Sequence, residues 1–160
     1  MGDFNARIHG MREHEEETIG PHIFGKGLKY LEKKQMDREV LNRDLLMEVA
    51  RENDLRITNT WFKKPESKLI SFRIPGTTDL KEIDNKKFAT TDHILCKNNQ
   101  THLVLNVETN TKTAFPSDHY PMVCTVKNVV LPNKHRKKRI NTFVEPNEGE
   151  KEAFNRNFKL

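Results

Sequence analysis

Hydrophobic and polar positions follow a helical period most clearly in residues 42–53 and the position just before them. Apolar side chains recur there at spacings of three and four, and charged side chains fill the positions between them. The apolar positions are Leu41, Leu45, Leu46, Val49 and Ala50, and the charged ones are Arg43, Glu48, Arg51 and Glu52. Asparagine is a favourable residue at the start of a helix, so Asn42 is the expected N-cap. The pattern predicts a helix with one apolar and one charged face.

After this helix, several stretches have the alternation and the β-branched or aromatic content of strands. They are residues 55–62, 69–74, 88–96, 102–107 and 120–130, separated by polar turns. Residues 1–40 hold several glycines and an acidic run at 13–17, so apart from the first few residues they are expected to be irregular. One clear helix among several strands predicts an α/β sandwich or an α+β domain within residues 1–130.

Beyond residue 130 the strand pattern ends in a basic run and then a stretch rich in Glu and Asn. We interpret 131–160 as a basic and then polar tail, with disorder as one reading of its low apolar content. The basic run is either a nuclear-localisation or phosphate-contacting patch, or plain solvated surface. Its residues are Lys134, Arg136, Lys137, Lys138 and Arg139.

The composition predicts a thin hydrophobic core and mildly favours a polyanionic partner for the protein. Only 34% of the 160 residues are hydrophobic, and the net charge is +5. Cys96 and Cys124 lie far apart in apolar stretches, which predicts free thiols in a reducing compartment. No apolar run approaches the roughly 18 residues of a membrane span, and the N-terminus lacks a signal-peptide pattern. We therefore expect an intracellular protein, nuclear or cytoplasmic and not secreted, without a membrane partner.

Candidate catalytic residues lie at the edges of the strand-like stretches. Asp3 and Asn5 are two positions apart, which in a strand would place both on one face, where they suit a phosphate and its metal. Asp118 and His119 are neighbours in a loop between two prolines, where a metal ligand would lie next to a base. Asp92 is the candidate to hold the second imidazole nitrogen of His119. Each site alone is more simply explained as a turn, a strand end or a polar loop.

Four segments in fixed order carry a resemblance. They are G-D-F-N-A at 2–6, N-D-L-R-I-T-N-T-W-F at 53–62, T-D-H-I-L at 91–95 and S-D-H-Y-P at 117–121. In this order they resemble the endonuclease/exonuclease/phosphatase family, which includes abasic-site endonucleases, DNase I-like nucleases and the endonuclease domain of non-LTR retrotransposons. The segment at 53–62 looks most like the retrotransposon form of the domain.

The resemblance implies an α/β (α+β) sandwich of the DNase I-like type, with this chain as the second half of the four-layer fold. It implies that Asp3 and Asn5 contact the scissile phosphate and that Asp118 binds Mg²⁺ or Mn²⁺. It also implies that His119, paired with Asp92, contacts the phosphate or acts as the base. DNA or another nucleic acid is the implied partner, while phosphoinositides and other phosphoesters stay open as substrates.

The resemblance also implies a fragment, because the family's first half supplies a metal-binding glutamate that would precede residue 1. The expected function is therefore an endonuclease-like phosphodiesterase fragment with an incomplete site. The alternatives are a non-catalytic module that binds nucleic acid or protein through the same scaffold and the basic run, and a remnant with neither property. Exposed sheet faces or edges would favour association.

Overall fold

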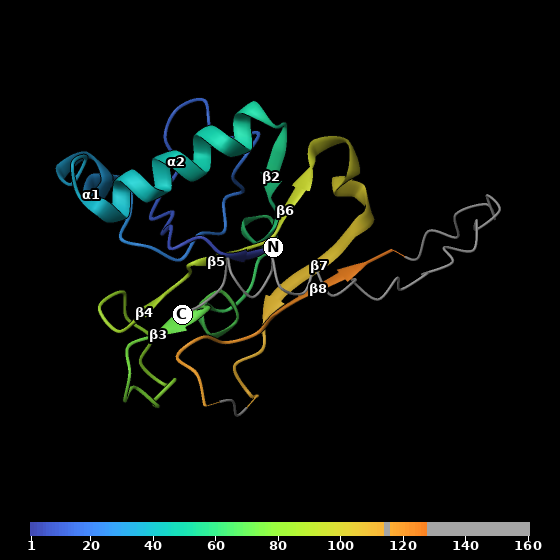
Figure 1. The fold of residues 1–160 in the computed structure, drawn as a ribbon. Coiled ribbons are helices and arrows are strands. Elements are labelled where there is room, and N and C mark those ends of the chain that lie inside the picture. The colour runs from blue at the N-terminus through green and yellow to red at the C-terminus, as the bar shows by residue number, and fades with distance from the viewer. Residues whose placement is uncertain (114–115, 128–160) are drawn as a thin grey trace, which may run out of the picture. The chain divides into compact units, whose positions relative to one another are not determined.

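A computed structural model describes residues 1–113 and 116–127, and these contain short helices and short strands in one mixed arrangement (Figure 1). The α-helices are α1 (Leu28–Lys33) and α2 (Arg38–Glu52). The strands are β1 (Gly2–Asp3), β2 (Leu55–Ile57), β3 (Phe72–Arg73), β4 (Phe88–Ala89), β5 (Asp92–His93), β6 (Leu95–Lys97), β7 (Val104–Thr109) and β8 (Met122–Val126). The 3₁₀ helices are Thr58–Thr60, Glu66–Lys68 and Asn98–Leu103. The expectation of a mixed α+β chain is confirmed at this level.

The strands of the described ranges pair in twos, all antiparallel. The pairs are β1 with β5, β2 with β6, β3 with β4, and β7 with β8. In Figure 1 both helices lie on one side of these pairs, and β7 and β8 form the longest hairpin. None of the helices in the described residues is long and apolar enough to cross a membrane.

Helix α2 begins earlier than the apolar pattern indicated. Its N-cap is Asp37, whose carboxylate accepts the backbone N–H of Glu39 at 3.0 Å. The prediction of Asn42 as N-cap is wrong, because Asn42 lies within the helix. Its side-chain amide donates instead to the carbonyl oxygen of Asn5 at 3.0 Å. The helix is thereby tied to the segment that follows β1.

The buried face of α2 also differs from the predicted one. Leu41, Leu45 and Val49, expected to be buried, are 49%, 60% and 42% exposed. Arg43, expected on the charged face, is fully buried. The helix turns a different face to the core than predicted, because Arg43 has partners there. Its guanidinium pairs with Glu15, which compensates the charge, and donates to two carbonyl oxygens of the segment that precedes the helix. The residues that α2 buries are Val40, Arg43, Leu46, Met47 and Ala50.

The predicted strands were correctly located, but several were too long or shifted, and residues 128–130 of the stretch 120–130 lie outside the described residues. The stretch 55–62 ends as a strand at Ile57 and continues as a 3₁₀ helix, in which the Thr60 hydroxyl donates to the Ile57 carbonyl at 2.7 Å. The stretch 88–96 is divided into β4, β5 and β6, and the stretch 102–107 starts inside a 3₁₀ helix. Helix α1 was missed altogether, since residues 1–40 were expected to be irregular. Residues 131–160, including the predicted basic patch, lie outside the described residues.

Two small apolar clusters form the core, in keeping with the low hydrophobic content. The first joins the segment after β1 to α2 and β2, and the second lies beside β3 and β4. The first contains Ala6, Ile8, Ile19, Leu46, Met47 and Ile57, and the second contains Phe24, Ile70, Phe88 and Tyr120. Both clusters include residues of the segments that carry the candidate chemistry, namely Ala6, Ile57 and Tyr120, so packing helps to fix where those segments meet.

Candidate functional site

Two carboxylates face each other across the β1–β5 pair. Asp3 is the register partner of Asp92, and residues directly opposite in an antiparallel pair present their side chains on the same face. The sequence places them 89 positions apart, as the residue numbers show. Strand pairing therefore brings together two carboxylates that no local pattern connects.

His119 reaches the same place through a short strand-like contact with β3. It forms an isolated antiparallel bridge with Phe72, and the backbone N–H of Tyr120 donates to the carbonyl of Ser71 at 2.8 Å. The fully buried Ser71 also accepts, at its hydroxyl oxygen, the backbone N–H groups of Thr91 and Asp92, each at 3.0 Å. One serine thus fixes the segments of both His119 and Asp92, and sequence reasoning missed it.

The resulting cluster contains Asp3, Asp92 and His119. Imidazole Nδ1 of His119 lies 2.9 Å from Asp92 Oδ2, and Nε2 lies 3.9 Å from Asp3 Oδ2. The three side chains are 35%, 22% and 37% exposed, so a ligand from solvent reaches all of them. The ring of Phe72 packs edge-on against His119, with centroids 5.2 Å apart, and limits its rotation.

Asn5 was predicted to share one strand face with Asp3, but its backbone is not in a strand conformation. Strand β1 ends at Asp3, and Asn5 has a φ of 49°, so the alternation that would have put Asp3 and Asn5 on one face does not hold. The Asp3 carboxylate instead accepts the backbone N–H of Asn5 at 2.9 Å in a tight turn. Asn5 lines the large hollow that His119 also lines.

Asp118, the predicted metal ligand, does not join the cluster. Residues 116–118 form a bend beside β3, and the carbonyl of Asp118 accepts the backbone N–H of Arg73 at 2.9 Å. Within the described residues, the group that could hold a metal ion consists of Asp3, Asp92 and His119.

Behind the cluster lies a buried pair that the sequence reasoning also missed. His93 Nε2 lies 2.7 Å from the carbonyl oxygen of Ala6, and its Nδ1 lies 3.2 Å from the side-chain amide of Asn59. Asn59 also accepts the backbone N–H of Ile94 at 3.2 Å. Burial lowers the pKa of His93, so the ring stays neutral and acts as a structural hydrogen-bonding group. The sequence signal that could have identified His93 and Asn59 is that each is a polar residue within a largely apolar, strand-like stretch.

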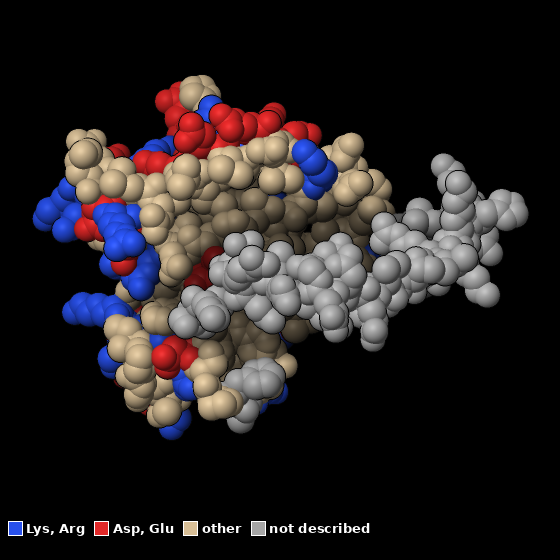
Figure 2. Space-filling model, viewed as in Figure 1, with Lys and Arg blue, Asp and Glu red and all other residues tan. Residues whose placement is uncertain are grey.

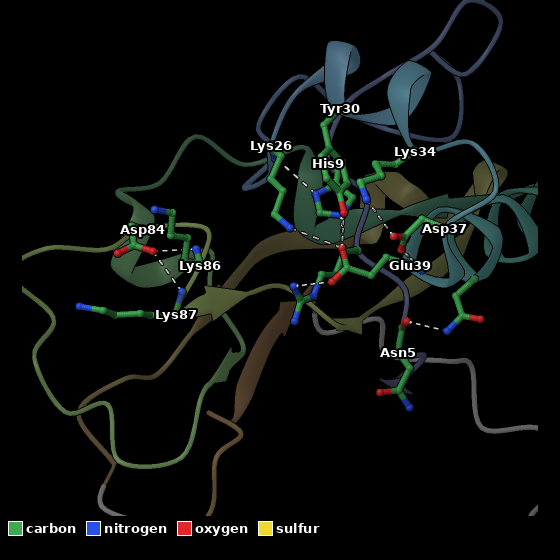
Figure 3. Close-up of polar contacts among 12 residues, drawn as sticks. Asn5, His9, Lys26, Tyr30, Lys34, Asp37, Glu39, Asp84, Lys86 and Lys87 are labelled. Atoms are coloured by element: carbon green, nitrogen blue, oxygen red, sulfur yellow. Dashed lines mark hydrogen bonds and ion pairs between the residues drawn. The ribbon is translucent and has the colours of Figure 1, made fainter.

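A second polar cluster surrounds Glu39 at the start of α2 (Figure 3). Its carboxylate accepts the hydroxyl of Tyr30 at 2.8 Å, faces His9 at 3.2 Å and pairs with Arg7 at 2.7 Å. Burial lowers the pKa of His9 to about 4, and burial together with Glu39 raises that of Tyr30 to about 12. Burial acts to raise the pKa of Glu39, but Tyr30 and the nearby cations outweigh it and lower that pKa. Glu39 is thus a compensated carboxylate.

The donor set at the cluster fits a hard divalent cation. The ligating atoms of Asp3, Asp92 and His119 lie within 4.8 Å of one another, and carboxylate oxygens are the ligands that Mg²⁺ and Mn²⁺ prefer. Nδ1 of His119 already contacts Asp92, so the main ligands for a cation would be the carboxylate oxygens of Asp3 and Asp92.

Comparison with known proteins adds no relative on which to base the site. No protein-family model, no curated protein and no solved structure matches the chain. The case for function therefore depends on the residues and their geometry.

Proposed function

We propose that the chain is a metal-dependent phosphodiesterase domain of the DNase I-like type that acts on nucleic acid. The observation that carries the proposal is the 2.9 Å contact of His119 with Asp92, beside Asp3. These residues come from three of the four segments that carry the family resemblance. The fourth segment supplies Asn59, which supports His93 behind them. Segments spread over the whole described chain thus meet at one exposed cluster.

In this mechanism Asp92 orients the imidazole of His119. When Nδ1–H donates to Asp92, the lone pair is on Nε2, which faces the side of Asp3. Nε2 then takes a proton from the attacking water, or in its protonated form binds the phosphate. A divalent cation held by Asp3 and Asp92 would neutralise the phosphate charge.

Nicking of supercoiled plasmid by the purified 160-residue chain, with Mg²⁺ or Mn²⁺, tests this proposal. We expect His119→Ala to lower the rate at least ~100-fold, a usual contribution of a general base, and a chelator to stop it. His102→Ala is the matched control, because His102 is an exposed histidine outside the cluster. It should nick like the wild type. A folded wild type without nicking, or undiminished nicking by His119→Ala, would reject the proposal.

The exposed apolar side of α2 favours a second candidate, a non-catalytic module that binds a protein. Leu41, Leu45 and Val49 form a stripe at a spacing of four residues on one side of the helix. If this stripe is the functional surface, the wild type should associate in sedimentation without nicking plasmid, and Leu45→Lys should abolish that association. Unchanged sedimentation of the variant would reject this candidate.

A further inference from the structure

His119 lines more than one hollow, and two of these hollows are also lined by Lys or Arg side chains. The smaller has a volume of about 260 Å³ and is lined by Arg73, Lys112, Ser117, three threonines and two apolar or aromatic residues besides His119. None of the described residues that line it carries a carboxylate. Its polar side chains are hydrogen-bond donors or cations, the groups that contact phosphate oxygens.

Arg73 is held in place at the edge of this smaller hollow. Its guanidinium donates to the carbonyl oxygens of Thr77 and Ser117, each at 3.2 Å, and lies 5.3 Å from the centroid of the Tyr120 ring. Lys112 is exposed and its backbone, not its side chain, is fixed by Asn110. Over residues 1–113 and 116–127, no carboxylate lies within ion-pair distance of either cation. Their positive charge is therefore uncompensated there.

The larger hollow, about 710 Å³, extends from His119 along most of α2, from Arg38 to Val49. It contains Arg7, which Glu39 neutralises, and the exposed Arg38, for which the described part of the chain offers no ion-pair partner. Figure 2 shows most Lys and Arg side chains of this face on the left, the side where α1 lies, and most acidic side chains along the top, over α2. Apolar and aromatic side chains, among them Phe4 and Phe72, form much of the remaining wall.

We propose that a single strand of nucleic acid lies through both hollows and crosses His119. One backbone phosphate is bound by Arg73 and Lys112 and another by Arg38, while bases contact the apolar wall of the larger hollow. This inference rests on the proposed function and narrows its substrate to a polymer, because a molecule that contacts Arg38 and Lys112 at once must occupy both hollows. Cations on both sides of a site, with aromatic rings between them, are the features with which proteins track a strand.

Binding of a fluorescein-labelled single-stranded oligonucleotide to the full chain, measured by anisotropy in EDTA, tests the inference without cleavage. Each lost phosphate contact should reduce the slope of log K against log salt by ~0.7, which is about 5-fold in Kd at 0.1 M salt. We expect this of Arg38→Ala and of Lys112→Ala, and about 25-fold of the double variant if the contacts are independent.

Lys86→Ala is the matched control. Lys86 is exposed, lies in a turn whose backbone N–H groups are bound by Asp84, and in Figure 3 is well apart from Asn5 and Glu39. It should bind like the wild type. Thermal melting of each variant checks that it folds, and because both test positions are exposed and have no side-chain partner among the described residues, we expect unchanged melting.

The outcomes separate this inference from the proposed function. Unchanged affinity in both test variants, or an equal loss in Lys86→Ala, overturns the inference even if His119→Ala abolishes nicking. Weakened binding by both variants supports it even if the wild type does not nick, which would reject only the catalytic proposal. Inositol hexakisphosphate serves as a compact polyanion that can compete with the oligonucleotide. If its affinity falls as much in one single variant as in the double variant, the protein has one anion site. That result would also overturn the proposal that a strand lies through both hollows.

Discussion

Replacing Arg43 by methionine should destabilise the fold more than any surface substitution on α2. Arg43 is fully buried, and its guanidinium donates to the carbonyl oxygens of Ile8 and Gly10, each at 2.9 Å. It also contacts both carboxylate oxygens of Glu15, one of them at 2.8 Å. Methionine has a similar length but removes every one of these donors.

The size of the effect follows from what the substitution leaves behind. Glu15 is only 5% exposed, so without Arg43 its negative charge stays buried, and the backbone N–H of Arg12, at 2.7 Å, still donates to it. Removing one partner of a buried ion pair costs about 3–5 kcal/mol in free energy of unfolding. Replacing both partners by apolar residues removes the isolated charge, so Arg43→Met with Glu15→Met should cost clearly less than Arg43→Met alone.

Urea unfolding followed by circular dichroism at pH 7 measures these differences. Arg51→Met is the control, because Arg51 is exposed on the same helix and should change the free energy of unfolding by about 0.5 kcal/mol or less. If Arg43→Met costs no more than Arg51→Met, Arg43 is not buried against Glu15. If the double variant is worse than Arg43→Met, the isolated-charge argument fails.

Two further predictions concern pH and the support of the site. Because burial lowers the pKa of His9 from 6.5 to about 4, the unfolded chain binds a proton in that window that the folded chain does not. Stability should therefore be full above pH 6.5 and be lost as the pH falls toward 4, and His9→Gln should flatten this dependence in urea titrations at several pH values. An equally steep loss in His9→Gln would assign the proton uptake to another group. Ser71→Ala leaves the buried backbone N–H groups of Thr91 and Asp92 without an acceptor, at a cost of about 1–3 kcal/mol, and should slow nicking by displacing Asp92. Wild-type stability of Ser71→Ala would contradict this support role, whereas Ser71→Thr, which keeps the hydroxyl, should lose less nicking activity.

The sequence predicted the positions of the helix and the strands better than it predicted their geometry. Periodicity located α2 and the strand-rich region after it, because local spacing reflects which backbone conformation can bury apolar side chains. It failed on the face of α2, where Leu45 is exposed and Arg43 is buried. That reversal depends on Glu15, which lies 28 residues before Arg43 and meets it only in the folded chain. A local pattern contains no information about such a partner.

The same division holds for the candidate site. By itself, the sequence determined the residue types near one another along the chain, including Asp92 and His119 in their short motifs. Only the tertiary structure decided that Asp3 faces Asp92 through strand register, that His119 turns its Nδ1 to Asp92, and that Asp118 is not part of this cluster. Register and side-chain direction depend on pairing between segments far apart in the chain, and a shift of one residue moves a side chain to the opposite face.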